Sequence, residues 1–90
     1  MPYIPSEARD RINSSDSPMN SGELNYLVTT IIDNYITDRG LGYSTLNDIM
    51  GVLSCAQHEM YRRVVSLYED KKMLTNGDVW NPANTGKLSK

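Results

Sequence analysis

Residues 45–68 read TLNDIMGVLSCAQHEMYRRVVSLY and form a long amphipathic stretch. Apolar residues recur at alternating steps of three and four positions, which is the spacing of a coiled-coil-like helical seam. The members of this seam are Leu46, Ile49, Leu53, Ala56, Met60, Val64 and Leu67. The pattern predicts one long helix from about residue 45 to 75, and Asn76-Gly77 supplies its stop.

A second apolar row runs beside this seam on the same predicted helix. It consists of Met50, Val52, Tyr61, Val65 and Tyr68. A surface helix normally carries one apolar stripe, so apolar side chains on more than one face require cover from a neighbour. We therefore expect an interface between copies of the chain. Its expected members are Met50, Val64, Val65, Leu67 and Tyr68.

An earlier segment predicts a second helix, from about residue 21 to 39. Its apolar stripe at helical period consists of Leu24, Leu27, Val28, Ile31, Ile32, Tyr35 and Ile36. Asn20 stands three residues before Glu23, so a capping box is expected at the helix start. At the other end Gly40 follows Arg39, which favours termination there.

The connector between the two predicted helices, Leu41-Gly42-Tyr43, is short, and Ser44 is expected to cap the second helix. A short connector favours antiparallel neighbours, so the predicted fold class is all-α, an antiparallel helical hairpin. At 1.5 Å per residue the helices measure roughly 28 Å and 45 Å, so the longer one overhangs its partner. A two-helix core is thin, and self-association into a dimer or higher assembly is expected.

The chain divides into three predicted parts. Residues 1–19 form an N-terminal arm, residues 20–77 the hairpin domain, and residues 78–90 an irregular tail. The arm has room for a short helix from about Ser6 to Ile12, with Ser6 as its cap. Its apolar residues are Tyr3, Ile4, Ala8 and Ile12. The alternative to an oligomer is a compact monomer in which this arm folds over the overhang.

Composition excludes several classes of protein. The 90 residues are 39% hydrophobic and 22% charged, which is typical of a globular domain. The formal net charge of −2 lacks the basic excess of a dedicated nucleic-acid binder. No apolar run reaches the roughly 20 residues that span a bilayer, and the start does not resemble a signal peptide. With a single cysteine, Cys55, we expect a reducing compartment, the cytoplasm.

Catalytic chemistry is not expected. Cys55 and His58 lie about one helical turn apart, but a zinc site needs two further ligands, and one helix offers no oxyanion hole. His58-Glu59 begins like a zinc-protease motif, yet Arg62 stands where the second histidine belongs. We expect a small half-buried cysteine, a solvated histidine, no metal and no cofactor.

One cluster suggests a binding site for an anion. The expected hairpin register brings the start of the first helix close to two arginines and three tyrosines of the chain. Free amides at a helix start attract anions, and arginine forks suit phosphate. The candidate residues are Asn20, Ser21, Gly22, Tyr26, Tyr61, Arg62, Arg63 and Tyr68. Ordinary ion pairs of Glu59 with both arginines are the competing interpretation.

Short motifs in order along the chain resemble a group of small bacterial and bacteriophage proteins of unknown function. The motifs are MPYI at 1–4, GELNY at 22–26, YRRV at 61–64, YED at 68–70 and NGDV at 76–79. The resemblance implies a phage or bacterial setting, and the group has no assigned activity that could be transferred to this chain. Proline is frequent in that group at the position of Leu67, which implies a helix interruption past Val65.

These observations predict a small non-enzymatic, homo-oligomeric accessory protein of a phage or bacterium that acts by binding. In the first hypothesis the exposed apolar helix face docks on a host protein. In the alternative, a pocket between subunits near Arg62 and Arg63 sequesters a nucleotide signal. A purely structural oligomer is the third hypothesis. The expected partners are therefore the chain itself and either a host protein or a nucleotide, with neither membrane nor nucleic acid.

Overall fold

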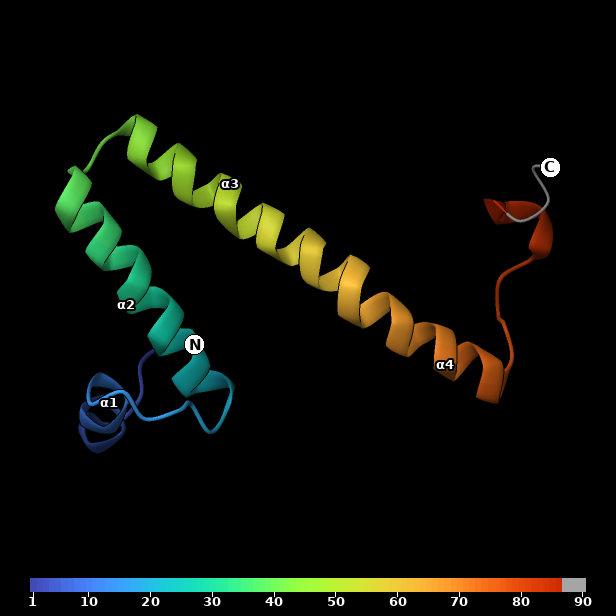
Figure 1. The fold of residues 1–90 in the computed structure, drawn as a ribbon, viewed down its shortest axis with the longest axis horizontal. Coiled ribbons are helices and arrows are strands. Elements are labelled where there is room, and N and C mark those ends of the chain that lie inside the picture. Colours follow the sequence, from blue (N-terminus) through green and yellow to red (C-terminus); the bar gives the residue numbers. More distant parts are fainter. Residues whose placement is uncertain (87–90) are drawn as a thin grey trace. The chain divides into compact units, whose positions relative to one another are not determined.

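The computed structural model describes residues 1–86, and these are helical, without strands. The elements, labelled in Figure 1, are α1 (Ser6–Asn13), α2 (Ser21–Arg39), α3 (Tyr43–Met60), η1 (Tyr61–Val65), α4 (Ser66–Asn76) and η2 (Pro82–Asn84). The all-α prediction is confirmed. The chain divides into two compact units, residues 1–51 and the part from Val52 onward, which are described separately.

Helix α2 has the predicted bounds, and its two ends follow from single residues. The side-chain oxygen of Asn20 accepts a hydrogen bond from the Glu23 amide at 2.9 Å, which caps the start. Gly40 has a φ of 94° and its amide donates to the Ile36 carbonyl at 2.7 Å. That backbone conformation suits glycine, so the helix ends there.

The N-terminal arm packs on α2. It contains the expected short helix, α1, and Ile12 on that helix is 4% exposed, the only hydrophobic residue buried among residues 1–86. Ile4 lies close to Gly22, where a β-carbon would stand 3.3 Å from the isoleucine methyl group. The small residue at the start of α2 therefore lets the arm approach the helix.

Two of the expected helix caps are wrong. Pro5 precedes α1 and the Ser6 hydroxyl donates to the Glu7 carboxylate at 3.4 Å, so Ser6 does not cap a backbone amide. Helix α3 already begins at Tyr43, which places Ser44 inside the helix. In both cases the serine lies inside the helix, one or two residues past the cap position.

The long helical stretch extends through α3, η1 and α4 without interruption, close to the predicted 45–75 (Figure 1). Its middle element, η1, is a π turn, in which the Ser66 amide bonds the Tyr61 carbonyl five residues earlier. The Ser66 hydroxyl also donates to the Arg62 carbonyl at 2.8 Å, which satisfies an acceptor beside the turn. The chain remains helical past Val65, and the irregularity is the π turn that ends at that residue.

The connection between α2 and α3 is short, and one side-chain bond joins the helices beside it. The Tyr35 hydroxyl donates to the Asp48 carboxylate at 3.3 Å. Packing of the two helices along their lengths as a hairpin stays a prediction. Beyond Gly77, whose φ is 90°, the described tail holds only the short η2 turn. Residues 87–90 of the predicted tail lie outside the described part.

Candidate interaction surface and charged clusters

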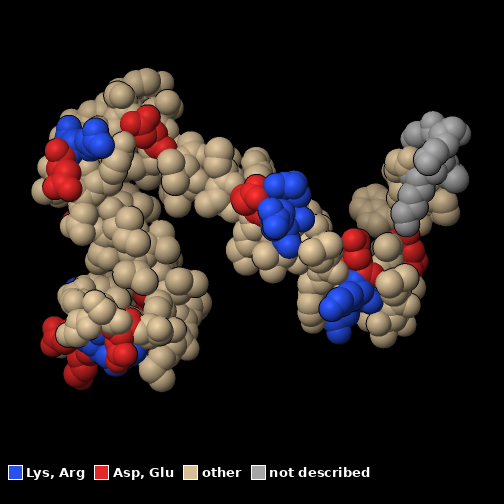
Figure 2. Space-filling model, viewed as in Figure 1, with Lys and Arg blue, Asp and Glu red and all other residues tan. Residues whose placement is uncertain are grey.

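The apolar face of the second unit is open. Met60 is 59% exposed, Val64 57% and Tyr68 61%. Val64 and Tyr68 belong to the predicted interface, whose remaining members are Met50 and Leu67, which are also exposed, and Val65, which is half-buried. Figure 2 shows the long helix as mostly tan surface between separate groups of charged side chains. Fully burying one such apolar side chain contributes about 1.5–3 kcal/mol, so this face is a strong candidate for contact with a partner.

The π turn realigns the apolar rows of this face. Eight residues of a straight α-helix cover about 2.2 turns, so residues 61 and 69 would point in different directions. A π turn holds about one extra residue, which brings them onto one face. Their side chains indeed meet, because the Tyr61 hydroxyl donates to the Glu69 carboxylate at 2.9 Å. This bond raises the pKa of Tyr61.

The same realignment changes the membership of the seam. Met60, Val64 and Tyr68 follow one another at steps of four across the π turn, so they form one stripe. The predicted seam continued from Val64 to Leu67, which suits a regular α-helix. The turn therefore exchanges Leu67 for Tyr68 and continues the stripe that begins with Leu53 and Ala56. We call these five residues, Leu53, Ala56, Met60, Val64 and Tyr68, the seam of the second unit.

Arg62 and Arg63 point their charges at an acid on their own helix. Arg62 lies 3.0 Å and Arg63 3.9 Å from the Glu59 carboxylate. The two arginine side chains are 69% and 68% exposed, so these are solvated surface ion pairs. The competing interpretation of this cluster is therefore present in the structure, and neither guanidinium is held in a dry pocket.

The start of α2 already holds an anionic group, the carboxylate of Glu23. Glu23 is 8% exposed, and its carboxylate accepts bonds from the Arg11 guanidinium and from the Met19 amide. Arg11 also donates to the Ser17 carbonyl at 2.9 Å. The bond from Arg11, followed by the bond from Met19, lowers the pKa of Glu23. The capping box is thus modified, because this carboxylate bonds the Met19 amide and not the Asn20 amide.

The predicted anion site draws on both units. Its members Asn20, Ser21, Gly22 and Tyr26 belong to residues 1–51, and Tyr61, Arg62, Arg63 and Tyr68 belong to the second unit. Within the first unit, the Tyr26 hydroxyl donates to the Asn13 side chain at 3.2 Å, while Asn20 caps α2. These residues have structural roles of their own, and their assembly into one site with the arginines stays a prediction.

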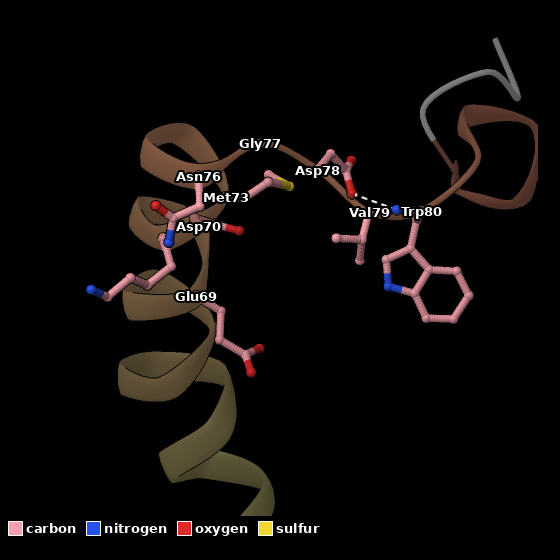
Figure 3. A pocket seen from close by; sticks show the side chains of 9 residues that line it. Glu69, Asp70, Met73, Asn76, Gly77, Asp78, Val79 and Trp80 are labelled. Atoms are coloured by element: carbon pink, nitrogen blue, oxygen red, sulfur yellow. Dashed lines mark hydrogen bonds between the residues drawn. The ribbon is translucent and has the colours of Figure 1, made fainter.

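A hollow at the end of α4 was not predicted from the sequence. It has a volume of about 430 Å³ and lies between the last turns of α4 and the chain that follows (Figure 3). Its lining residues are Glu69, Asp70, Lys72, Met73, Asn76, Gly77, Asp78, Val79 and Trp80. The carboxylate of Asp78 accepts a bond from the Trp80 amide at 2.9 Å and so shapes the turn. The lone tryptophan after the Gly77 stop was the signal that could have indicated it.

A second hollow lies between the N-terminal arm and α2. It measures about 220 Å³ and is lined by Pro2, Tyr3, Arg9, Tyr26, Thr29, Thr30 and Asp33. The Arg9 guanidinium lies 5.7 Å from the Tyr26 ring centroid and bonds the Ile4 carbonyl at 2.9 Å. Arg9 therefore links the arm to α2. Because Arg9 is positive and Asp33 is negative, the lining of this hollow has no excess of either charge.

The cysteine and histidine of α3 lie on its surface. Cys55 is a free thiol and is exposed, where we expected it half-buried, and His58 is exposed as expected. Among residues 1–86 no group of three or more histidine, cysteine or acidic side chains is arranged to hold a metal ion. Within the same residues, no helix has both the length and the hydropathy to traverse a lipid bilayer.

Comparison with known proteins gives one match. The family model described as a domain of unknown function (DUF6899) matches residues 1–79. This range covers the first unit, residues 52–79 of the second unit, and every residue of the predicted site and seam. No curated protein and no solved structure was found to be similar to the chain.

Proposed function

The chain belongs to the DUF6899 family, a family of unknown function, and on that premise we propose from its own residues that it acts by binding and not by catalysis. The proposed binding surface is the seam of the second unit, and the first partner is another copy of the chain. The observation that carries the proposal is the exposure of this seam. Met60, Val64 and Tyr68 are each more than half exposed, and no residue of this helix from Val52 to Asn76 is buried.

Helix energetics support self-association. Most helical stability in proteins comes from burying an apolar face and not from the helix propensity of the residues. From Val52 to Asn76 the described helix buries no side chain fully, so its own unit supplies little of that stabilisation. A partner helix on the seam supplies it. Most soluble oligomers are homo-oligomers with closed symmetry, so another copy of the chain is the first partner to consider.

The wider role that we propose is that of a small accessory protein of a bacterium or bacteriophage. In this role the oligomer uses its remaining exposed apolar residues to dock on a host protein in the cytoplasm. The first unit offers such residues on α2, where Leu24 is 54% and Ile31 61% exposed. An amphipathic helix with an open face is a common means of recognising a helix or groove of another protein.

The proposal is tested by substituting the seam in the full chain. Leu53→Glu and Met60→Glu place a charge in the proposed contact, where its desolvation is costly. Light scattering coupled to size-exclusion chromatography is expected to report an oligomer for the wild type and a monomer for both variants. Circular dichroism is expected to show reduced helicity in the monomers, because the helix loses its cover.

Ser54→Glu is the matched control for these variants. It adds the same charge to the same exposed helix at a position beside the seam, so the oligomer and its helicity are expected to persist. A wild-type chain that stays monomeric at high micromolar concentration would contradict the proposal. Equal dissociation of the Ser54→Glu chain would show that the contact lies elsewhere.

Nucleotide sequestration has less support. Phosphate binding by Arg62 and Arg63 has to compete with their ion pairs to Glu59. The start of α2 is occupied by the Glu23 carboxylate, which repels a second anion. Calorimetric titration with a panel of nucleotides tests this alternative. Binding that disappears in Arg62→Ala and Arg63→Ala would favour it over docking on a protein.

A further inference from the structure

The two halves of the long helix carry opposite net charge. Helix α3 has two acids, Asp48 and Glu59, and neither lysine nor arginine, which gives a formal charge of −2 with His58 neutral. Residues 61–76 carry four cations and two acids, for a formal charge of +2. The cations are Arg62, Arg63, Lys71 and Lys72 and the acids are Glu69 and Asp70. Charge thus changes sign near Met60.

This pattern distinguishes the two ways of pairing two such helices. In a parallel pair each half lies against the like-charged half of the other copy, which is unfavourable. In an antiparallel pair the acidic α3 of one copy lies against the basic 61–76 segment of the other, at both ends. The helix dipoles also oppose each other in an antiparallel pair, which adds to the preference.

The seam residues are arranged symmetrically about Met60. Leu53 and Ala56 lie about two turns and one turn before Met60. The π turn gives Val64 and Tyr68 the corresponding positions one and two turns after it. An antiparallel pair centred on Met60 therefore sets the small Ala56 against Val64, and Leu53 against Tyr68. A parallel pair would set alanine against alanine and leave that layer underfilled.

We propose that the seam binds a second copy of the chain in antiparallel orientation, with the two Met60 residues at the centre. This inference rests on the proposed self-association and adds its orientation and register. The pairing places Glu59 of each copy near Arg63 of the other, because both side chains lie on the same flank of the seam, so their ion pair within a chain can be exchanged for one between chains. Ala56 and Val64 lie four residues to either side of Met60, and the π turn sets Tyr68 against Leu53, where a regular helix would set Leu67.

Disulfide trapping tests the orientation, because Cys55 is the single cysteine and Cys55→Ser gives a clean background. Leu53→Cys and Tyr68→Cys are made separately in full-length Cys55→Ser chains, one of them with a size tag. The reduced chains are mixed, allowed to exchange subunits and oxidised. The expected product is the mixed dimer, with little dimer of either variant alone, since two Leu53 positions lie roughly 21 Å apart along an antiparallel pair.

The pair Ala56→Cys and Val64→Cys repeats the measurement one turn from the centre and covers the case in which a Tyr68 variant fails to assemble. Met60→Cys is expected to crosslink with itself. Dimers of Leu53→Cys alone, without mixed product, would overturn the proposal and leave self-association intact. Efficient oligomers without a Met60→Cys crosslink would overturn it as well. A wild-type chain that is monomeric by light scattering would overturn the proposed function together with it.

Discussion

Glu23 is a buried acid that accepts hydrogen bonds from Arg11 and Met19. Its lowered pKa predicts that the stability of the first unit depends on pH. The folded pKa lies below the ordinary value of 4.5, so the bonds from Arg11 and Met19 stabilise the fold fully above that value. The contribution is lost as the pH falls from 4.5 through the lowered folded pKa, because the protonated acid no longer pairs with the guanidinium. The free energy of unfolding of the wild type, measured by urea titration, is expected to decrease over this acid range.

Glu23→Gln is the control for this prediction. The amide keeps the shape of the side chain and does not titrate, so the variant is expected to be less stable at pH 7. Its stability is also expected to fall less steeply with acid than that of the wild type. Parallel pH profiles of the two chains would refute the role assigned to the Glu23 carboxylate.

Ile12 predicts the contribution of the arm to the first unit. Ile12→Ala removes buried methylene groups between α1 and α2 and is expected to cost about 2–4 kcal/mol in the free energy of unfolding. Ile31→Ala makes the same chemical change at a position that is 61% exposed and is expected to cost less. Denaturant titration measures both. A loss below about 1 kcal/mol at Ile12 would mean that the arm adds little to α2.

The roles of only some of these residues could be predicted from the sequence. The Asn20 cap and the Gly40 stop follow from local rules, because each acts within four residues of chain. The pairing of Glu23 with Arg11 spans twelve residues and depends on the path of the loop between α1 and α2, which no local rule supplies. The sequence therefore indicated the role of Glu23 in the capping box but not its ion pair with Arg11 inside the first unit.

At the scale of the element, the π turn predicts an unusual response to deletion. Deleting Arg63 removes about the one residue that the turn accommodates, so the helix can become regular while Met60, Val64 and Tyr68 stay on one stripe. The oligomer is expected to persist with a higher melting temperature. Deleting Lys72, a cation beyond the seam, is the matched control and is expected to give no such gain. Light scattering and thermal melts at 222 nm report both results.

In a regular α-helix the same deletion would rotate everything after residue 63 by about 100° and would replace Leu67 by Tyr68 on the seam, with no gain in stability expected. A melting temperature of the chain lacking Arg63 that is unchanged or lower would therefore contradict the geometry of the π turn. The sequence held two signals for this turn: the successive steps of four from Met60 to Val64 to Tyr68, and Ser66 four residues after Arg62. These signals were not enough to predict the π turn, because apolar Leu67 also fits a regular seam and serine is common on helix surfaces.

At the scale of the whole molecule, helix content and helix ends could be predicted because periodicity and capping are properties of the chain itself. The packing of the helices could not, because an apolar stripe indicates that something covers it and not what does. The long helix of 43–76 illustrates this limit, since Leu53, Met60 and Tyr68 are open within their own unit. The partner had to be inferred from charge and register.

In the proposed function this open seam is completed by another copy of the chain. The most direct test is the melting temperature of the wild-type helix, followed at 222 nm over a hundredfold range of protein concentration. If assembly stabilises the helix, each tenfold increase adds about 1.4 kcal/mol of association free energy per dimer and raises the melting temperature by a few degrees. A melting temperature that does not change with concentration, together with a monomeric mass by light scattering, would contradict the account.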